Sequence, residues 1–325
     1  MLSRVAENIY WMARYIERAE NTARLINVNT HLLLDLPKDV RPGWEPLIHI
    51  TGSEEFYRSL YEQAEERSVV RFLIGDLRNS SSILSSIGHA RENARTIRDI
   101  IPREAWEQVN ELYLNIKGQL QAGLSERRRY DYLKSVIQGA QQITGLLAGT
   151  MLHDFGYDFL RMGRNLERAD MTTRIIDVRS ANLLPTHAGE LPPFEHAQWM
   201  SVLKSLTAYQ MYRRHTQVAV RRTAVLQFLL QNRQFPRACY HCLGEVEACL
   251  HDLPRSDLLL RTVARLQRMI SEAPVETLDH DRLHAFTDEL QLGLADLHSQ
   301  ITATYFAHDG HSAGVPEERA AHAGT

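Results

Sequence analysis

Residues 13–28 read ARYIERAENTARLINV, and residues 163–178 read GRNLERADMTTRIIDV. We call them the first and second cassette. Both contain a small residue, an arginine, a Glu-Arg-Ala triplet, an acidic residue and a second arginine at the same spacing. Five residues recur 150 positions later, namely Arg14, Glu17, Arg18, Ala19 and Arg24. The recurrence predicts an internal repeat.

Two further stretches extend the repeat in the same order. The sequence from Trp44 aligns with that from Trp199 at an offset of 155, and the sequence from Phe72 aligns with that from Phe228 at an offset of 156. We therefore predict a tandem duplication, with halves 1–150 and 151–307 packed as one unit around a pseudo-twofold axis. Residues 308–325 are rich in His, Gly and Ala without periodicity, so we expect a disordered tail.

The spacing of apolar residues predicts an all-α protein. Alternation with period two is nearly absent, whereas steps of three and four recur throughout the chain. The clearest seam begins the chain and comprises Leu2, Val5, Ile9, Met12, Ile16, Ala19, Ala23 and Ile26. The predicted fold is a tandem-duplicated helical bundle with pseudo-twofold symmetry.

Composition excludes several classes of protein. The 325 residues are 44% hydrophobic and 24% charged, with a formal charge of −3, so we expect neither a nucleic-acid nor a membrane partner. The N-terminus meets charge every few residues and lacks a signal-peptide core, which favours a cytoplasmic protein. Three cysteines confined to one helical segment, Cys239, Cys242 and Cys249, read as buried thiols. We predict no metal and no cofactor, because a zinc site would need a second ligand pair.

A helical wheel places Glu17, Glu20 and Arg24 beside the apolar seam, whereas Arg18 falls on the far side. Glu20 and Arg24 are spaced i,i+4, and Arg14 and Glu17 are spaced i,i+3, so each carboxylate has a partner in reach. The wheel therefore divides the Glu-Arg pair between two faces of the helix.

The cassette charges recur although residues between them differ. Asn165 and Met171 stand where the first cassette has Tyr15 and Asn21. Exposed ion pairs contribute only a few tenths of a kcal/mol, so we infer that these charges are at least partly buried. Two interpretations remain open, a structural ion-pair network across the pseudo-axis and a central cleft for a charged ligand or peptide. The residues concerned are Arg14, Glu17, Glu20, Arg24, Arg164, Glu167, Asp170 and Arg174.

A second charged segment, ARENARTIRD at residues 90–99, is present in one half only. We call Arg91, Glu92, Arg95 and Arg98 the arginine stripe. It is typical of a solvated helix face, and it could also bind an anion or a partner. The chain contains no Gly-rich phosphate loop, no Gly-x-Ser-x-Gly elbow and no His-Glu-x-x-His.

Together, YIERAENTARLI, ARENARTIRD followed by REAWEQVNELY, and NLERADMTTRII resemble the alpha-E domain family of bacterial proteins of unknown function. That family is named for its Glu-Arg motif, here Glu17-Arg18 and Glu167-Arg168. By this resemblance, the family's signature positions correspond to Arg14, Glu17, Arg18 and Arg24 in the first cassette and to Arg164, Glu167, Arg168 and Arg174 in the second. It implies no catalytic residue.

The resemblance also implies a setting. Family members are associated with peptide synthesis or modification systems, alongside circularly permuted ATP-grasp ligases and transglutaminase-like proteins. We therefore expect a non-catalytic partner or a substrate- or peptide-binding component of such a system. The alternatives are a helical hydrolase or transferase that uses the central carboxylates, and a structural dimerisation module. The enzyme alternative requires an open pocket and a Glu whose pKa is raised by burial.

Overall fold

The computed structural model of the chain describes residues 3–35, 43–181, 192–217 and 219–306. Every regular element within these ranges is a helix, which confirms the predicted all-α class. No helix in these ranges has both the length and the apolar character needed to cross a membrane. The predicted tail, residues 308–325, lies outside the described residues.

The first half contains eight helices within its described residues. They are α1 (Ser3–Asp35), α2 (Glu45–Ile50), α3 (Glu54–Leu60), α4 (Glu66–Ile74), α5 (Ile83–Thr96), α6 (Arg103–Gly118), α7 (Leu120–Leu124) and α8 (Arg129–Thr150). Ser82 caps α5 by accepting a hydrogen bond from the backbone N–H of Ser85, and Pro102 directly precedes α6.

The second half follows after a turn at residues 151–154. Its helices are α9 (Phe155–Ala181), α10 (Pro192–Ser205), α11 (Tyr209–Thr216), α12 (Arg222–Leu226), α13 (Cys239–Asp252), α14 (Asp257–Ser271) and α15 (His280–Ile301), with π-helical turns η2 (Gln227–Gln231) and η3 (Thr302–Phe306). Pro254 lies between α13 and α14.

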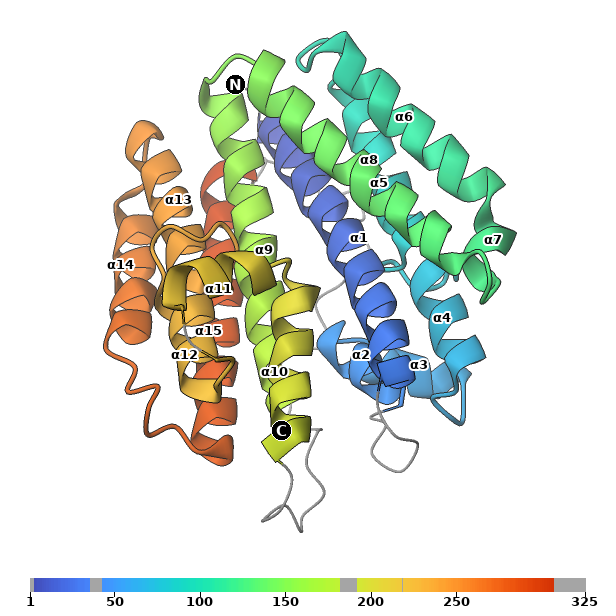
Figure 1. The fold of residues 1–325 in the computed structure, drawn as a ribbon. Coiled ribbons are helices and arrows are strands. Elements are labelled where there is room, and N and C mark those ends of the chain that lie inside the picture. The colour runs from blue at the N-terminus through green and yellow to red at the C-terminus, as the bar shows by residue number, and fades with distance from the viewer. Residues whose placement is uncertain (1–2, 36–42, 182–191, 218, 307–325) are drawn as a thin grey trace.

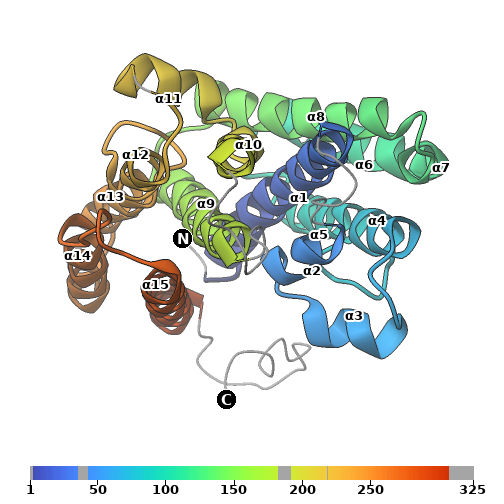
Figure 2. The same cartoon turned by 60° about the horizontal axis from the view of Figure 1, so that its bottom comes forward.

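The long helices form two groups that meet at α1 and α9 (Figures 1 and 2). In one group α1 packs against α5 and α8, and α6 packs against the same two helices. In the other group α9 packs against α13 and α15, and α14 packs against both of these. The order of contacts is therefore the same in the two halves, which is what a duplication would produce. The duplication itself remains a prediction.

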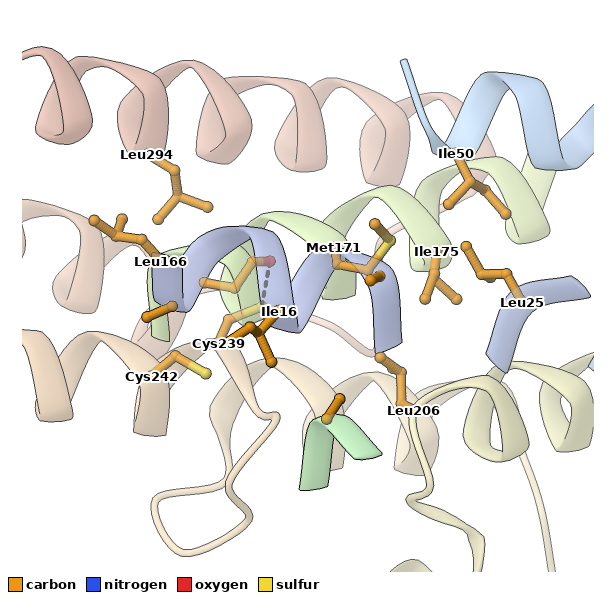
Figure 3. Close-up of a cluster of buried hydrophobic side chains, with 14 of the residues drawn as sticks. Ile16, Leu25, Ile50, Leu166, Met171, Ile175, Leu206, Cys239, Cys242 and Leu294 are labelled. Carbon is orange, nitrogen blue, oxygen red and sulfur yellow. Dashed lines mark hydrogen bonds between the residues drawn. The ribbon is translucent and has the colours of Figure 1, made fainter. Parts of the chain in front are cut away.

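The two halves exchange their short second helices. Helix α2 of the first half packs on α9, and α10 of the second half packs on α1. The turns that follow these helices correspond in the alignment, and both contain a residue with left-handed backbone, Gly52 with φ 63° and Thr207 with φ 54°. Each half thus completes the core of the other, and Figure 3 shows Leu25, Ile50, Ile175 and Leu206 in one buried cluster.

Candidate functional site

The backbones of α1 and α9 approach each other closely at Gly163. A Cβ atom added to Gly163 would lie 2.3 Å from the carbonyl oxygen of Tyr10. The small residue in the second cassette therefore allows a second backbone to approach closely. Ala13 occupies the corresponding position of the first cassette and is buried. This contact brings the two cassettes together along a parallel helix pair.

The two Glu-Arg motifs bind each other reciprocally. The Nε of Arg18 donates to Oε1 of Glu167 at 2.6 Å, and the Nε of Arg168 donates to Oε2 of Glu17 at 2.9 Å. Each motif thus supplies one carboxylate and one guanidinium to the other helix. The pairs lie 149 and 151 positions apart in sequence, so they form only when the two halves pack together.

Each of these glutamates also accepts a hydrogen bond from a second arginine. The Nε of Arg14 donates to Oε2 of Glu167 at 2.8 Å. Glu17 accepts through Oε1 from Nη1 of Arg237 at 2.6 Å. Arg14 therefore pairs across the interface, whereas the i,i+3 spacing had paired it with Glu17. A carboxylate with two charge-assisted partners is held more rigidly than one with a single partner.

Local pairs extend the network toward the C-termini of both cassettes. Arg24 donates to Glu20 at 2.7 Å, which confirms the predicted i,i+4 pair, and Arg174 donates to Asp170 at 2.8 Å in the second cassette. Arg237 also donates to Glu20, at 3.0 Å, and to Oδ1 of Asn21, at 2.7 Å. Arg237 therefore links the Glu-Arg pairs to one of the local pairs.

The network is buried, as the sequence indicated. The side chains of Glu17, Glu20 and Glu167 are 2–3% exposed, and that of Asp170 is 24% exposed. Burial alone raises the pKa of Glu167, but the charges of Arg18 and Arg14 outweigh burial and lower that pKa to about 2. Burial likewise raises the pKa of Glu17, and Arg168 and Arg237 reverse the shift. Both carboxylates are therefore ionised at neutral pH.

The predicted placement of Arg18 was wrong. Arg18 does not lie away from the core, because its guanidinium reaches Glu167 and also donates to the hydroxyl of Ser81 at 3.3 Å. The wheel assumed one packed face, whereas α1 contacts α5, α8, α9 and α10. A long arginine side chain also reaches well beyond the direction of its Cβ. The ion-pair network between the cassettes therefore includes both residues of each Glu-Arg motif.

Arg237 was missed by the sequence analysis. It lies just before α13 and is 7% exposed, and its backbone carbonyl accepts a hydrogen bond from the hydroxyl of Thr172 at 2.9 Å. The alignment from Phe72 and Phe228 places Arg237 opposite Ser81, the residue that binds Arg18. The sequence contained one signal for Arg237, because an arginine stands there where the corresponding position of the first half has a serine.

Arg164 is the cassette arginine that departs from the pattern. Its Nε is buried and has no hydrogen-bond partner among the described residues. It lines a small cavity between α1, α8 and α9, which has room for about one water molecule. The second cassette is therefore not an electrostatic copy of the first.

The arginine stripe lies on the outer side of α5 and the turn that follows it. Arg91 donates to Oδ1 of Asn110 at 2.7 Å, and its guanidinium lies 5.2 Å from the ring centroid of Tyr113. Glu92 pairs with Arg91 at 2.7 Å and with Arg95 at 2.8 Å. The side chains of Arg95 and Arg98 are 58% and 65% exposed. The stripe therefore lies apart from the cassette network and faces solvent.

A neutral pair adjoins the network where α1 meets α15. The Oη of Tyr10 and the Nδ1 of His298 are 2.8 Å apart. Burial lowers the pKa of His298 to about 3, with a further contribution from Arg14, and burial raises the pKa of Tyr10 to about 12. Both groups are neutral at pH 7, so the hydrogen bond joins two uncharged side chains, and the tautomer of His298 sets which of them donates.

This pair predicts a pH dependence of stability. An unfolded histidine binds a proton near pH 6.5, whereas folded His298 does so near pH 3, so the unfolded state gains from protonation between these values. When the pH falls from 6.5 to 5, the free energy of unfolding of the wild type should therefore fall by roughly 2 kcal/mol more than that of His298→Gln. Urea unfolding at both pH values measures the difference. Equal losses in the two proteins would contradict the placement of His298.

The arrangement is suited to holding two helices in register rather than to proton transfer. A general acid needs a carboxyl group whose pKa is raised, whereas the pKa values of Glu17 and Glu167 are lowered. All four cassette carboxylates are paired with arginine. This pairing does not favour the enzyme alternative, which remains a prediction.

The cysteines among the described residues supply no reactive thiolate. The three cysteines are free and buried, and burial raises the pKa of Cys242 and of Cys249 to about 12. Figure 3 shows Cys239 and Cys242 with Ile16 and Leu166 in the cluster around the cassettes. No group of three or more His, Cys, Asp or Glu side chains in this part of the chain is placed to hold a metal ion.

Comparison with known proteins gives a family without an assigned activity. An uncharacterized protein of Mycobacterium bovis is 25% identical over 339 residues, and uncharacterized proteins of two Mycobacterium tuberculosis strains are 25% and 24% identical. Each alignment covers 94% of this chain and 37% of the relative. No solved structure matches the chain. Residues 1–306 match the Alpha-E family, described as a predicted alpha-helical domain with a conserved ER motif, and the chain therefore belongs to that family.

Proposed function

We propose that this protein is a non-catalytic partner or peptide-binding component of a peptide synthesis or modification system. Its partners would be a circularly permuted ATP-grasp ligase and a transglutaminase-like protein, as the family resemblance implies. The cassette network would serve as the rigid centre of a scaffold whose outer helices contact the partner. This role requires no reactive group within the chain.

The main support for this proposal is that the related proteins are much longer than this chain. The chain spans little more than a third of the mycobacterial proteins that it matches, so in those proteins the equivalent region belongs to a longer polypeptide. A helical domain that is joined to other parts of the same polypeptide can act together with those parts. The paired carboxylates add support, because they leave the cassettes without a free acid or base.

The test is association with a ligase. The full chain would be purified and mixed with the ATP-grasp ligase of the same operon. Co-elution in size-exclusion chromatography and a change in ATP turnover are the expected results. If the two proteins elute separately and ATP turnover is unchanged, the proposal is wrong.

The arginine stripe supplies a sharper version of this test. Reversing two exposed charges in Arg95→Glu/Arg98→Glu should weaken the complex about tenfold, because exposed charges at an interface steer association. Arg103→Glu is the matched control, since Arg103 is 86% exposed on the neighbouring helix α6. If the double variant and the control bind the ligase with equal affinity, the arginine stripe is not part of the interface.

A further inference from the structure

The second half contains a long segment without acidic residues. Residues 196–244 include no aspartate and no glutamate, although 40 of the 325 residues of the chain are acidic. Apart from Arg237, which is buried in the cassette network, the segment contains six lysines and arginines, namely Lys204, Arg213, Arg214, Arg221, Arg222 and Arg233. A local excess of positive charge therefore lies outside the core of a chain whose formal charge is −3.

Four of these basic residues lie on and beside helix α11. Arg213 and Arg214 belong to α11, Lys204 is the penultimate residue of α10, which packs against α11, and Arg221 directly precedes α12. All four side chains are exposed, and none pairs with a carboxylate in the part of the chain that the structure describes. Met211 of the same helix is 46% exposed. We call these five residues the basic face.

The first half contains a unit of the same local structure. Tyr57 of α3 corresponds to Tyr212 of α11 at the offset of 155, and both tyrosines are buried. The hydroxyl of Tyr57 donates to the backbone carbonyl of Gln63 at 2.9 Å, and that of Tyr212 donates to the carbonyl of Ala219 at 3.1 Å. In both halves, the segment after the helix is therefore fastened to the helix by a tyrosine.

The charges on the two corresponding units are opposite. Residues 45–66 contain six glutamates and a single arginine, Arg58. Residues 200–222 contain five lysines and arginines and no acid. Because the same tyrosine hydrogen bond forms in both units, packing within each half does not require this difference in charge.

The glutamates of the first unit include three that lack a basic partner among the described residues. Glu55 lies on α3, and Glu62 and Glu65 lie in the segment that follows it. All three are exposed. Phe56, which occupies the position corresponding to Met211, is 41% exposed. We call Phe56 and the three glutamates the acidic face.

The two faces lie far apart on one molecule. Figure 2 shows α3 and α11 at opposite ends of the helical assembly. A single copy therefore cannot bring its own basic and acidic faces together. Between two copies, however, the faces are complementary, because they carry opposite charges and each exposes one large apolar side chain.

We propose that the basic face of one molecule binds the acidic face of a second copy of the chain. Arginines of one face pair with glutamates of the other, beside a contact between Met211 and Phe56. Because the contact joins unlike faces, each pair of molecules keeps one basic and one acidic face unoccupied, and further copies add in the same way. This self-association is independent of the proposed association with a ligase.

Sedimentation equilibrium of the full chain tests the proposal. A small, charged interface is weak, so the average mass should rise above the 37.3 kDa of one chain between about 10 and 500 μM protein in about 20 mM salt. It should return toward 37.3 kDa in about 0.5 M sodium chloride, because salt screens exposed charges. If the mass is that of one chain at every concentration in low salt, the proposal is wrong.

An exchange of charges identifies the two faces. Arg213→Glu/Arg214→Glu gives a molecule with two acidic faces, and Glu55→Lys/Glu62→Lys gives a molecule with two basic faces. Each variant alone should associate at least about tenfold more weakly than the wild type, because like charges then meet. An equimolar mixture should recover the association of the wild type. If the mixture remains monomeric, the two faces do not bind each other.

A matched control lies on α14. Arg261→Glu/Arg268→Glu reverses two exposed arginines of the same half and changes the net charge by the same amount, so it should associate like the wild type. An equal loss in this control would mean that net charge, and not the basic face, sets the association. If Arg213→Glu/Arg214→Glu does not fold, Lys204→Glu/Arg221→Glu takes its place.

An oligoglutamate peptide distinguishes a second copy from another acidic partner. Added to the associated wild type, the peptide should compete for the basic face and lower the average mass. If the wild type is instead monomeric and binds the peptide, while Arg213→Glu/Arg214→Glu does not, the basic face serves a different acidic partner. That result would overturn the proposal of self-association.

Discussion

Gly163→Ala is expected to lower the free energy of unfolding by about 3 kcal/mol, because the new methyl group would meet the backbone of the neighbouring helix. The added Cβ would lie 2.3 Å from the carbonyl oxygen of Tyr10 and 3.1 Å from its carbonyl carbon. Backbone atoms cannot move aside as a flexible side chain can. Helices α1 and α9 would therefore have to separate, which would lengthen the reciprocal pairs between the cassettes.

Urea unfolding of Gly163→Ala and Gly145→Ala separates this effect from helix propensity. Gly145 lies within α8, and a Cβ added there meets no atom within 4 Å. Gly145→Ala should therefore stabilise the protein by about 0.5–1 kcal/mol, because alanine favours the helix more than glycine does. If both variants are stabilised, α1 and α9 do not approach as described.

The second large effect is expected for Glu17→Gln, which should destabilise the protein by about 3 kcal/mol. Glu17 is 2% exposed and accepts from both Arg168 and Arg237. The neutral amide keeps the shape of the side chain but leaves two partly buried guanidinium groups without their counter-charge. The free energy of unfolding at pH 7, measured by urea titration, would show the loss.

An exposed glutamate gives the comparison for Glu17. Glu92 pairs with Arg95 at 2.8 Å, but the two side chains are 51% and 58% exposed. Glu92→Gln should therefore change the free energy of unfolding by less than about 0.5 kcal/mol. Similar values for Glu92→Gln and Glu17→Gln would mean that the cassette pairs contribute no more than surface pairs.

Local periodicity was sufficient to predict part of this structure. The all-α class and the Glu20–Arg24 pair follow from residues within a few turns of one helix. The burial of the cassette charges was inferred from their recurrence in both cassettes.

The rest depended on packing between distant segments. Arg18 could not be placed from a wheel, since its partner Glu167 lies on another helix. Arg237 lies outside both cassettes, and only the fold brings it to Glu17. The exchange of α2 and α10 between the halves also leaves no periodic signal. Cross-helix contacts of this kind are set by tertiary structure and not by local sequence.

The reciprocal pairing of the Glu-Arg motifs is the central claim, and a double-mutant cycle between Arg18 and Glu167 tests it most directly. The variants are Arg18→Met, Glu167→Gln and their combination, each unfolded in urea at pH 7. Because the two side chains are joined at 2.6 Å within a buried network, we predict a coupling free energy of about 2 kcal/mol. Single effects that add to within about 0.4 kcal/mol would show that the two motifs do not meet.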